Sequence, residues 1–387
     1  MHGLMAGLAR RHDVTAVSLV DAEFDVDECR RAMQDYCSEV ILVADPNSRG
    51  LTKRLLQLRS LASLRSFEYL RYSVPELRNQ LARLDERQFD VVHVEFQQLS
   101  HVVERRRTPG VRGAPLVIDT HEIAFDLVRQ FSRHAGTRAR KLYAAVNWQK
   151  LRHDEVAAFR RADGLCACSV ADREKILQEA PGARTAVVPN ACDLDFFAPR
   201  PSDPPGDGRT IVFFGLMSTF PNIDGVGWLL SDIWPRIAAA HPDARCKIIG
   251  KNAPKAISEM AGTRVEIVGF VEDLRPHLAS AAALVVPLRL GGGTRLKIIE
   301  GMAMGKAVVS TSLGAEGLDV VSERDIVIAD DAPGFARAVT ELLRQPERAA
   351  AIGRRARQTA HESFSWSSAA AKLEELYREV LHANGRN

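Results

Sequence analysis

Residues 281–305 read AAALVVPLRLGGGTRLKIIEGMAMG, and this stretch decides the fold class. The apolar run at 281–287 is rich in alanine and valine and is typical of a buried strand. Three glycines follow at 291–293, and the residues from Leu296 onward have the apolar spacing of a helix. A buried strand, a glycine loop and a helix in this order indicate one unit of a parallel α/β sheet.

The start of this helix has the chemistry of a phosphate site. Its first backbone N–H groups have no partner within the helix, and together with the helix dipole they attract anions. Arg295 and Lys297 add positive charge there, and Glu300 follows about one and a half turns later. A carboxylate at that place can accept hydrogen bonds from sugar hydroxyls. The sequence predicts a nucleotide-sugar site, with an ordinary strand–loop–helix unit and solvated Arg295 and Lys297 as the alternative.

Short β-branched runs alternate with longer amphipathic stretches along the whole chain, which predicts parallel sheets covered by helices on both faces. Strands are expected at 14–20, 39–43, 90–95, 115–119, 164–169 and 185–189, and again at 210–214, 246–250, 265–268, 283–287, 307–310 and 325–328. Helices are expected at 1–11, 52–72, 75–85, 137–162 and 367–382. The fold class is therefore α/β, with two doubly wound Rossmann-like domains facing a cleft.

The domain boundary is expected at the stretch APRPSDPPGDG, residues 198–208, because proline and glycine are typical of linkers. We expect domains at 1–198 and 210–365, a hinge at 199–209 and a C-terminal helix at 366–387, packed on its own domain or back across the hinge. The first domain opens with a helix instead of a strand and glycine turn. Its first strand is therefore expected to be missing, with a start site placed too far downstream as the hypothesis.

Composition is that of an ordinary globular protein of 387 residues, with 46% hydrophobic and 26% charged residues and a net charge of +3. No apolar run is long enough to span a bilayer, and no signal-peptide pattern opens the chain. The six cysteines are scattered, which favours free thiols and a cytoplasmic location. Cys166 and Cys168 lie in an expected strand without a second cysteine pair, so no metal site is expected.

Residues 46–141 carry 18 basic and 10 acidic residues, a local net charge of +8. Such a region can face nucleic acid, an anionic membrane or an acidic acceptor, and of these we expect the acceptor and the membrane surface, and no nucleic acid. The segment 52–72 alternates five basic residues with leucines. A basic amphipathic helix can lie on the inner face of the plasma membrane. The alternative is a core-packed helix with a solvated basic face.

Three loops of the second domain follow expected strands, where ligands of open α/β sheets bind. They are 215–222 (GLMSTFPN), 269–273 with Phe270, and 291–300. In the first domain His121 follows the strand at 115–119, within DTHE at 119–122. We expect His121 to contact the transferred group, with a loop histidine satisfied by its neighbours as the alternative. His93 and Glu95 are weaker candidates. Motifs typical of NAD-binding, P-loop, serine-hydrolase and zinc-protease sites are absent.

Four motifs in combination are specific enough to indicate a protein family. They are DVVHVE at 90–95, DTHE at 119–122, VVPNACD at 187–193 and GGGTRLKIIEGMAMGKAVVSTSLGAEGL at 291–318. They resemble those of the group 1 glycosyltransferases, family 4, of GT-B architecture, in a subgroup with a GGGTRLK loop. The resemblance implies an acceptor-binding first domain and a donor-binding second domain. It also implies transfer of a sugar, with retention, from a nucleoside diphosphate sugar to a hydroxyl of a polysaccharide or lipid-linked glycan.

The family's site residues can be placed on this chain. The resemblance assigns the chemistry to His121, Glu300, Arg295 and Lys297, and the donor to Gly215, Asn222, Phe270, Gly292, Gly293, Thr294, Leu296 and Glu300. Glu300 matches the glutamate that bonds the donor ribose. Gly292 stands where the family has the first glutamate of its Glu, seven residues, Glu pattern, of which Glu300 is the second. Leu216 and Asn222 stand where the family often has an arginine and a lysine. Arg295 and Lys297 are expected to replace that charge.

No metal or cofactor is expected, because no DxD motif ends a strand of the donor domain. Two other functions stay open. One is a nucleotide-sugar 2-epimerase on the same two-domain plan, and the other is a non-catalytic donor-binding subunit of a glycan assembly complex.

Overall fold

The computed structural model describes residues 2–21, 23–48, 50–84, 89–103, 111, 113–134 and 138–385. Parts of the basic region 46–141 therefore lie outside the described residues, namely 49, 85–88, 104–110, 112 and 135–137. The chain forms two compact units, Met1–Val188 with Trp366–Asn387, and Pro189–Ser365. Among the described helices, none combines the length and the apolar character needed to cross a bilayer.

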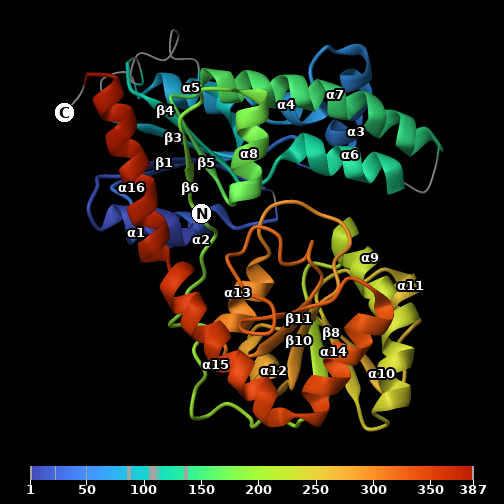
Figure 1. Cartoon of the computed structure of the whole chain (residues 1–387). Helices are drawn as coiled ribbons and strands as arrows, with labels where there is room; N and C mark the ends of the chain where they lie inside the picture. The colour runs from blue at the N-terminus through green and yellow to red at the C-terminus, as the bar shows by residue number, and fades with distance from the viewer. Residues whose placement is uncertain are drawn as a thin grey trace. The chain divides into compact units, whose positions relative to one another are not determined.

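The first unit is built from parallel strands and covering helices (Figure 1). Its strands are β1 (Thr15–Val20), β2 (Glu39–Ala44), β3 (Val92–Glu95), β4 (Leu116–Thr120), β5 (Gly164–Ala167) and β6 (Thr185–Val187). Its helices are α1 (His2–Ala9), α2 (Val26–Gln34), α3 (Gly50–Ala62), α4 (Phe67–Arg71), α5 (Pro75–Ala82), η1 (Gln97–Val102), α6 (Ala124–His134), α7 (Arg138–Arg161), α8 (Val170–Glu179) and α16 (Trp366–Ala383). The expected single sheet is divided in two, β1-β2 and β3-β4-β5-β6, because β1 and β3 are not paired.

The expected helix at 52–72 is two helices, α3 and α4, and this prediction was wrong. The helix is interrupted before Ser66, whose hydroxyl accepts a hydrogen bond from the Tyr69 N–H and so caps the start of α4. The Ser66 N–H and hydroxyl both donate to the Asp154 carboxylate of α7, each at 2.8 Å. A partner far away in the sequence therefore starts the second helix, which a local apolar pattern does not reveal.

The second unit contains one six-stranded parallel sheet in the order β12-β11-β10-β7-β8-β9. Its strands are β7 (Thr210–Phe214), β8 (Arg245–Ile249), β9 (Val265–Gly269), β10 (Ala283–Val286), β11 (Ala307–Ser310) and β12 (Val327–Ile328). Its helices are α9 (Phe220–Trp228), η3 (Leu229–Ile233), α10 (Trp234–Ala240), α11 (Lys255–Ser258), α12 (Arg275–Ser280), α13 (Leu296–Ala303), α14 (Ala332–Arg344) and α15 (Pro346–Ser363). The strand order reverses between β7 and β10, and open α/β sheets bind ligands beyond the carboxyl ends of the strands at such a point. Every expected strand of the chain is present.

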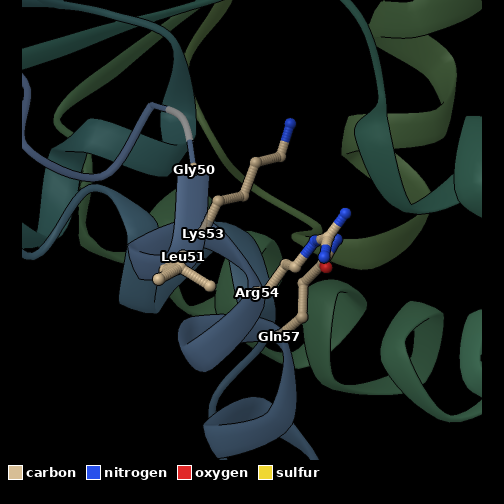
Figure 2. A pocket seen from close by; sticks show the side chains of 5 residues that line it. All are labelled: Gly50, Leu51, Lys53, Arg54 and Gln57. Carbon is tan, nitrogen blue, oxygen red and sulfur yellow. The ribbon is translucent and has the colours of Figure 1, made fainter.

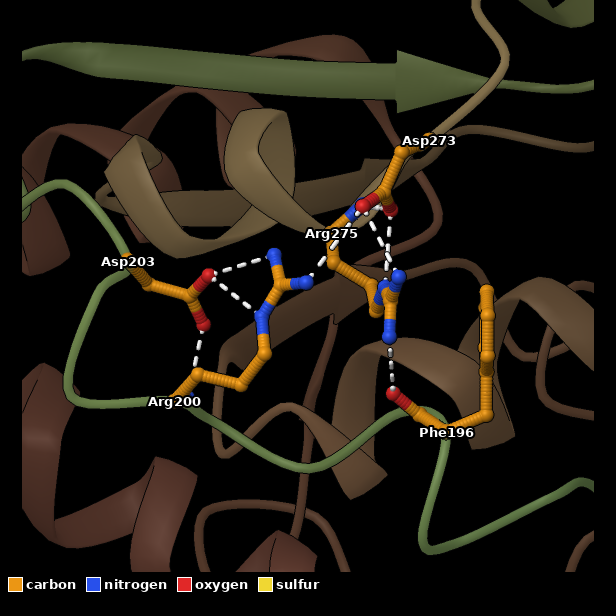
Figure 3. Close-up of polar contacts among 5 residues, drawn as sticks. All are labelled: Phe196, Arg200, Asp203, Asp273 and Arg275. Atoms are coloured by element: carbon orange, nitrogen blue, oxygen red, sulfur yellow. Dashed lines mark hydrogen bonds and ion pairs between the residues drawn. The ribbon is translucent and has the colours of Figure 1, made fainter.

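The proline-rich segment expected to be the hinge belongs to the second unit (Figure 3). Arg200 pairs with Asp203 at 2.7 Å and approaches Asp273 at 3.5 Å. Arg275 pairs with Asp273 at 2.8 Å, and its guanidinium lies 3.8 Å from the centroid of the Phe196 ring. These contacts tie the segment to the loop before α12, so the division falls after Val188 and not within 199–209.

The final helix groups with the first unit. Helix α16 contacts α1, β5 and β6, and Arg11 and His12 both lie 3.1 Å from the buried carboxylate of Glu374. Gly3 and Gly164 allow this close packing, because a Cβ at either position would come within 3.0 Å of an α16 side chain. Of the two placements left open by the sequence, the structure therefore has the helix returning to the first unit.

Candidate active site

The glycine loop after β10 is closed by Arg295, whose side chain folds back onto it. Arg295 is the residue before α13 and is only 8% exposed. Its Nη1 donates to the carbonyl oxygens of Gly292 and Gly293, and Asn190 donates to the Thr294 hydroxyl at 2.6 Å. The guanidinium therefore shapes the loop, where the sequence predicted that it would face a phosphate.

Lys297 reaches the other predicted donor loop, after β7. Its Nζ donates to Asn222 Oδ1 at 2.8 Å and lies 4.2 Å from the centroid of the Phe213 ring. A Cβ on Gly215 would stand 2.8 Å from both Lys297 Nζ and Asn222 Nδ2, so only glycine fits there without a shift. Burial, and then the charge of Arg295, lower the Lys297 pKa to about 7. Gly215, Asn222 and Lys297 thus meet where the strand order reverses.

Glu300 lies on the first turns of α13 and is half-buried. Burial raises its pKa to about 7, against the opposing effect of Lys297. Among the described residues, no hydrogen bond reaches its carboxylate, so both oxygens are available to a ligand.

The loops after β7, β8 and β9 are joined through their backbones. Gly250 N–H donates to Gly269 O at 2.7 Å, and Met217 N–H donates to Lys251 O at 3.0 Å. Lys251, which the sequence analysis missed, lies with its Nζ 4.3 Å from the centroid of the exposed Phe270 ring. In the sequence, Lys251 could have been found from its place directly after the strand expected at 246–250. Leu296 is exposed at the start of α13.

The first unit contains a separate cluster around His121, which follows β4. Nε2 of His121 donates to Oε2 of Glu95 at 2.6 Å, and Asp119 is buried between β3 and β5. Burial disfavours a charged His121 ring, but the hydrogen bond to Glu95 and the charge of Asp119 outweigh it and raise the His121 pKa. The parallel pairing of β3 with β4 places Glu95 beside Asp119. His121 is therefore held by an ion pair that the sequence did not predict.

Metal-ligand atoms of Asp119, His121 and Cys168 lie within 4.8 Å of one another, as do those of His93, Glu95 and Asp119. However, the His121 and Glu95 atoms nearest each other are already joined by a hydrogen bond. We therefore interpret the cluster as a hydrogen-bonded network.

The loop after His121 rests on a buried carboxyl group. Glu155 of α7 accepts hydrogen bonds from Gln97 Nε2 at 2.8 Å and from the Phe125 N–H at 3.1 Å. The same Gln97 amide donates to the Glu122 carbonyl at 2.8 Å. Burial raises the Glu155 pKa to about 8, so the group is largely protonated at neutral pH.

Comparison with known proteins agrees with this architecture. Residues 1–191 match the family model described as "Glycosyl transferase 4-like domain", and residues 208–345 match the one described as "Glycosyl transferases group 1". The sucrose-phosphate synthase of Thermosynechococcus elongatus has the same fold, with a TM-score of 0.73 over 98% of this chain and 92% of that protein, at 19% identity.

Curated relatives are similar over parts of their length. The alpha-maltose-1-phosphate synthase of Mycolicibacterium smegmatis is 26% identical over 255 residues, 58% of this chain and 65% of that protein. The GDP-mannose-dependent alpha-(1-6)-phosphatidylinositol monomannoside mannosyltransferase of the same organism is 27% identical over 283 residues, 65% of this chain and 72% of that protein. Three of the relatives are matched over 36%, 65% and 56% of their length, so the chain spans less than two thirds of each. With both family models matched and the fold in agreement, the chain belongs to the group 1 glycosyltransferases of GT-B architecture.

Proposed function

We propose that this protein transfers a sugar from a nucleoside diphosphate sugar to a hydroxyl of a glycan or lipid-linked acceptor. The observation that carries the proposal is the meeting of Gly215, Asn222 and Lys297 beside Glu300, at the reversal of the strand order. A glycine, a buried cation and a helix start suit a diphosphate, and an open carboxylate one turn further suits a ribose. The similarity to a GDP-mannose-dependent enzyme supports a nucleotide-sugar donor.

The chemical requirement is to stabilise the diphosphate as it leaves with growing negative charge. Lys297 in its ammonium form and the first N–H groups of α13 supply positive charge for this step. We propose that they make a divalent metal unnecessary, that His121 contacts the transferred sugar, and that the anomeric configuration is retained, as the family resemblance implies.

Donor binding tests this function directly. Titration calorimetry with UDP-, GDP- and ADP-sugars is expected to find one nucleotide class that binds, with the same Kd in EDTA. Glu300→Ala should raise that Kd about tenfold or more, because hydrogen bonds to a charged group contribute about 1.5–3 kcal/mol. The matched control Glu347→Ala changes an exposed carboxylate of α15 and should have no effect.

Binding of none of these donors would mean that the family describes the fold alone. Product analysis without an acceptor separates the remaining alternatives, because an epimerase would convert the donor sugar whereas a transferase would leave it intact or hydrolyse it slowly. Tight binding without turnover would indicate a donor-binding subunit.

We propose further that α3 places the enzyme on the cytoplasmic face of an anionic membrane, where it would meet a lipid-linked acceptor. Leu51, Leu55, Leu58, Leu61 and Leu64 are 51–90% exposed, and only Ser60 of the helix is buried. One face of α3 packs on α4 and α7, but these leucines lie outside that contact, and a leucine face of this kind is unusual in water. A named relative acts on a phosphatidylinositol-linked mannoside, which supports a lipid-linked acceptor.

The charge around this face favours lipid over a second copy of the chain. Residues 50–65 contain no acidic side chain, so self-association would bring like charges together. Figure 2 shows Lys53 and Arg54 extending from α3 into a pocket that Gly50 and Leu51 also line. Basic residues near a membrane surface contribute about 1 kcal/mol each toward binding anionic lipid.

Vesicle co-sedimentation tests the membrane surface. Binding is expected to rise with the phosphatidylglycerol content of phosphatidylcholine vesicles. Leu55→Ser with Leu58→Ser should weaken it at every composition, and Lys53→Gln with Arg54→Gln should remove the dependence on anionic lipid. Val170→Ser, an exposed residue of α8, is the matched control. Binding that does not change with anionic lipid content would contradict the proposal.

A further inference from the structure

The carboxylate of Glu95 is shared by two histidine rings. Oε2 accepts the 2.6 Å hydrogen bond from His121, and Oε1 lies 3.6 Å from His93 Nε2. Glu95 and His93 are two residues apart on β3, so they project to the same face of the strand. All three side chains are largely shielded from solvent, at 17–19% exposure. An interaction in this setting is screened far less than one on the surface.

The second nitrogen of His93 contacts the final helix. The Tyr377 hydroxyl of α16 lies 2.9 Å from His93 Nδ1. Burial raises the Tyr377 pKa well above its usual value, so the hydroxyl keeps its proton. His93 Nε2 faces the Glu95 carboxylate, which favours a proton on Nε2, and Nδ1 then accepts the hydrogen bond from the Tyr377 hydroxyl. Tyr377, 284 positions away in the chain, thus contacts the ring that lies next to the Glu95 carboxylate.

The end of β3 is shaped around the His121 ring. Phe96 follows Glu95 with φ 68°, a left-handed conformation that is costly for a phenylalanine. Its ring lies against the His121 ring with the centroids 4.3 Å apart. His121 is therefore held at one edge by Glu95 and on one face by Phe96, which leaves Nδ1 as the ring nitrogen for a ligand.

We propose that Glu95 is a positioning residue for His121, and that His93 and Tyr377 orient Glu95 in turn. Glu95 keeps the imidazole in one orientation and supports its protonated form, so that Nδ1 can donate to the transferred sugar. The contact between Nδ1 and the sugar rests on the proposed function, whereas the pairing of Glu95 with His121 does not. Helix α16 thereby contributes to a site formed by β3 and β4.

The titratable groups around the Glu95–His121 pair come from several elements. In the described part of the chain they are Glu95 and His93 from β3, Asp119 from β4, Cys166 from β5, Cys168 directly after it, and Tyr377 from α16. Burial raises the pKa of both thiols well above the usual value, so they are uncharged at neutral pH. The carboxylates of Glu95 and Asp119 are then the groups that favour a protonated His121.

An NMR titration of the histidine rings tests the pairing without relying on activity. The full chain is labelled with ¹⁵N-histidine, and the His121 signals are assigned by their loss in His121→Asn. Glu95→Gln is expected to lower the His121 pKa by about one unit, a tenfold loss of proton affinity. Tyr377→Phe, a milder change that keeps the packing, should lower it in the same direction by less. Tyr36→Phe is the control, because the Tyr36 hydroxyl has no partner among the described residues.

Turnover gives the second measurement. In Glu95→Gln, kcat is expected to fall about 10- to 100-fold, and its pH profile should move with the His121 pKa. The Kd of the nucleoside diphosphate without its sugar should stay unchanged, because the loops proposed to bind it lie in the other unit. An unchanged His121 titration in both Glu95→Gln and Tyr377→Phe would overturn the proposal. A shifted titration with unchanged kcat would support the pairing and overturn the placement of His121 at the sugar.

Discussion

Lys297→Ala is expected to raise the Kd of the nucleoside diphosphate about 100-fold. The Nζ atom is buried, donates to Asn222 and lies 2.8 Å from the position that a Cβ on Gly215 would take. Burial in the free protein has already removed water from the Lys297 amine. A diphosphate that accepts hydrogen bonds from its remaining N–H groups therefore gains charge-assisted bonds of about 1.5–3 kcal/mol. The measurement is titration calorimetry with the nucleotide class that binds the wild type.

Proton uptake gives a second readout for Lys297. Because burial lowers the pKa of the free lysine to about 7, the group is mostly neutral at pH 8. An arriving diphosphate favours the ammonium form, so binding at pH 8 should take up a proton that Lys297→Ala does not. Comparing binding enthalpies in buffers of different ionisation enthalpy measures this uptake.

Two control variants separate charge from loop shape. Lys255→Ala removes an exposed lysine that pairs only with a neighbour on its own short helix, and it should bind as the wild type does. Arg295→Ala should chiefly lower the melting temperature, because it removes the bonds to Gly292 and Gly293. A Lys297→Ala variant with wild-type affinity would place the diphosphate elsewhere.

The contrast between Arg295 and Lys297 shows how far the sequence could predict this site. The glycine loop, the helix start and Glu300 follow from apolar spacing and glycine content, and the structure has them where they were expected. Two basic residues so close together look equivalent in sequence. The extended backbone of Arg295, with ψ 97°, turns its side chain back onto the loop, while Lys297 already lies within the helix and reaches Asn222.

The remaining differences all depend on partners that are distant in the chain. Asp154 holds Ser66, which caps the start of α4, and Tyr377 reaches His93 from the final helix. Local patterns contain no information about such contacts, because each needs a tertiary arrangement to bring the two groups together. The division of the first unit's strands into two sheets is also hidden from local patterns, because such patterns predict strands and not the pairs between them.

Glu155→Gln is expected to stabilise the protein at pH 8.5 and to have little effect at pH 5. The carboxyl pKa is about 8 in the folded protein and about 4.3 in an unfolded chain. Between about pH 4.3 and pH 8 the folded state binds more protons than the unfolded state, so the free energy of unfolding falls as pH rises. Above pH 8 the cost of the buried charge is fully present. Each unit of pKa shift corresponds to about 1.4 kcal/mol of stability. Because the surroundings relax around a buried charge and reduce its cost, we expect Glu155→Gln to be more stable by an amount on the order of 2 kcal/mol.

The surroundings of Glu155 can accept the amide. The Phe125 N–H still finds an oxygen, and the Gln97 amide keeps its bond to the Glu122 carbonyl. The new NH2 group can donate to Gln98 once that amide turns over, because the Gln98 side-chain oxygen is buried without a partner among the described residues. Urea denaturation of wild type and variant at pH 5 and pH 8.5 measures the effect. Glu174→Gln, an exposed residue of α8, should be neutral at both pH values. Equal stabilities of Glu155→Gln and wild type at pH 8.5 would mean that folding does not raise the Glu155 pKa, and the loop after His121 would then rest on a carboxylate that is already charged at neutral pH.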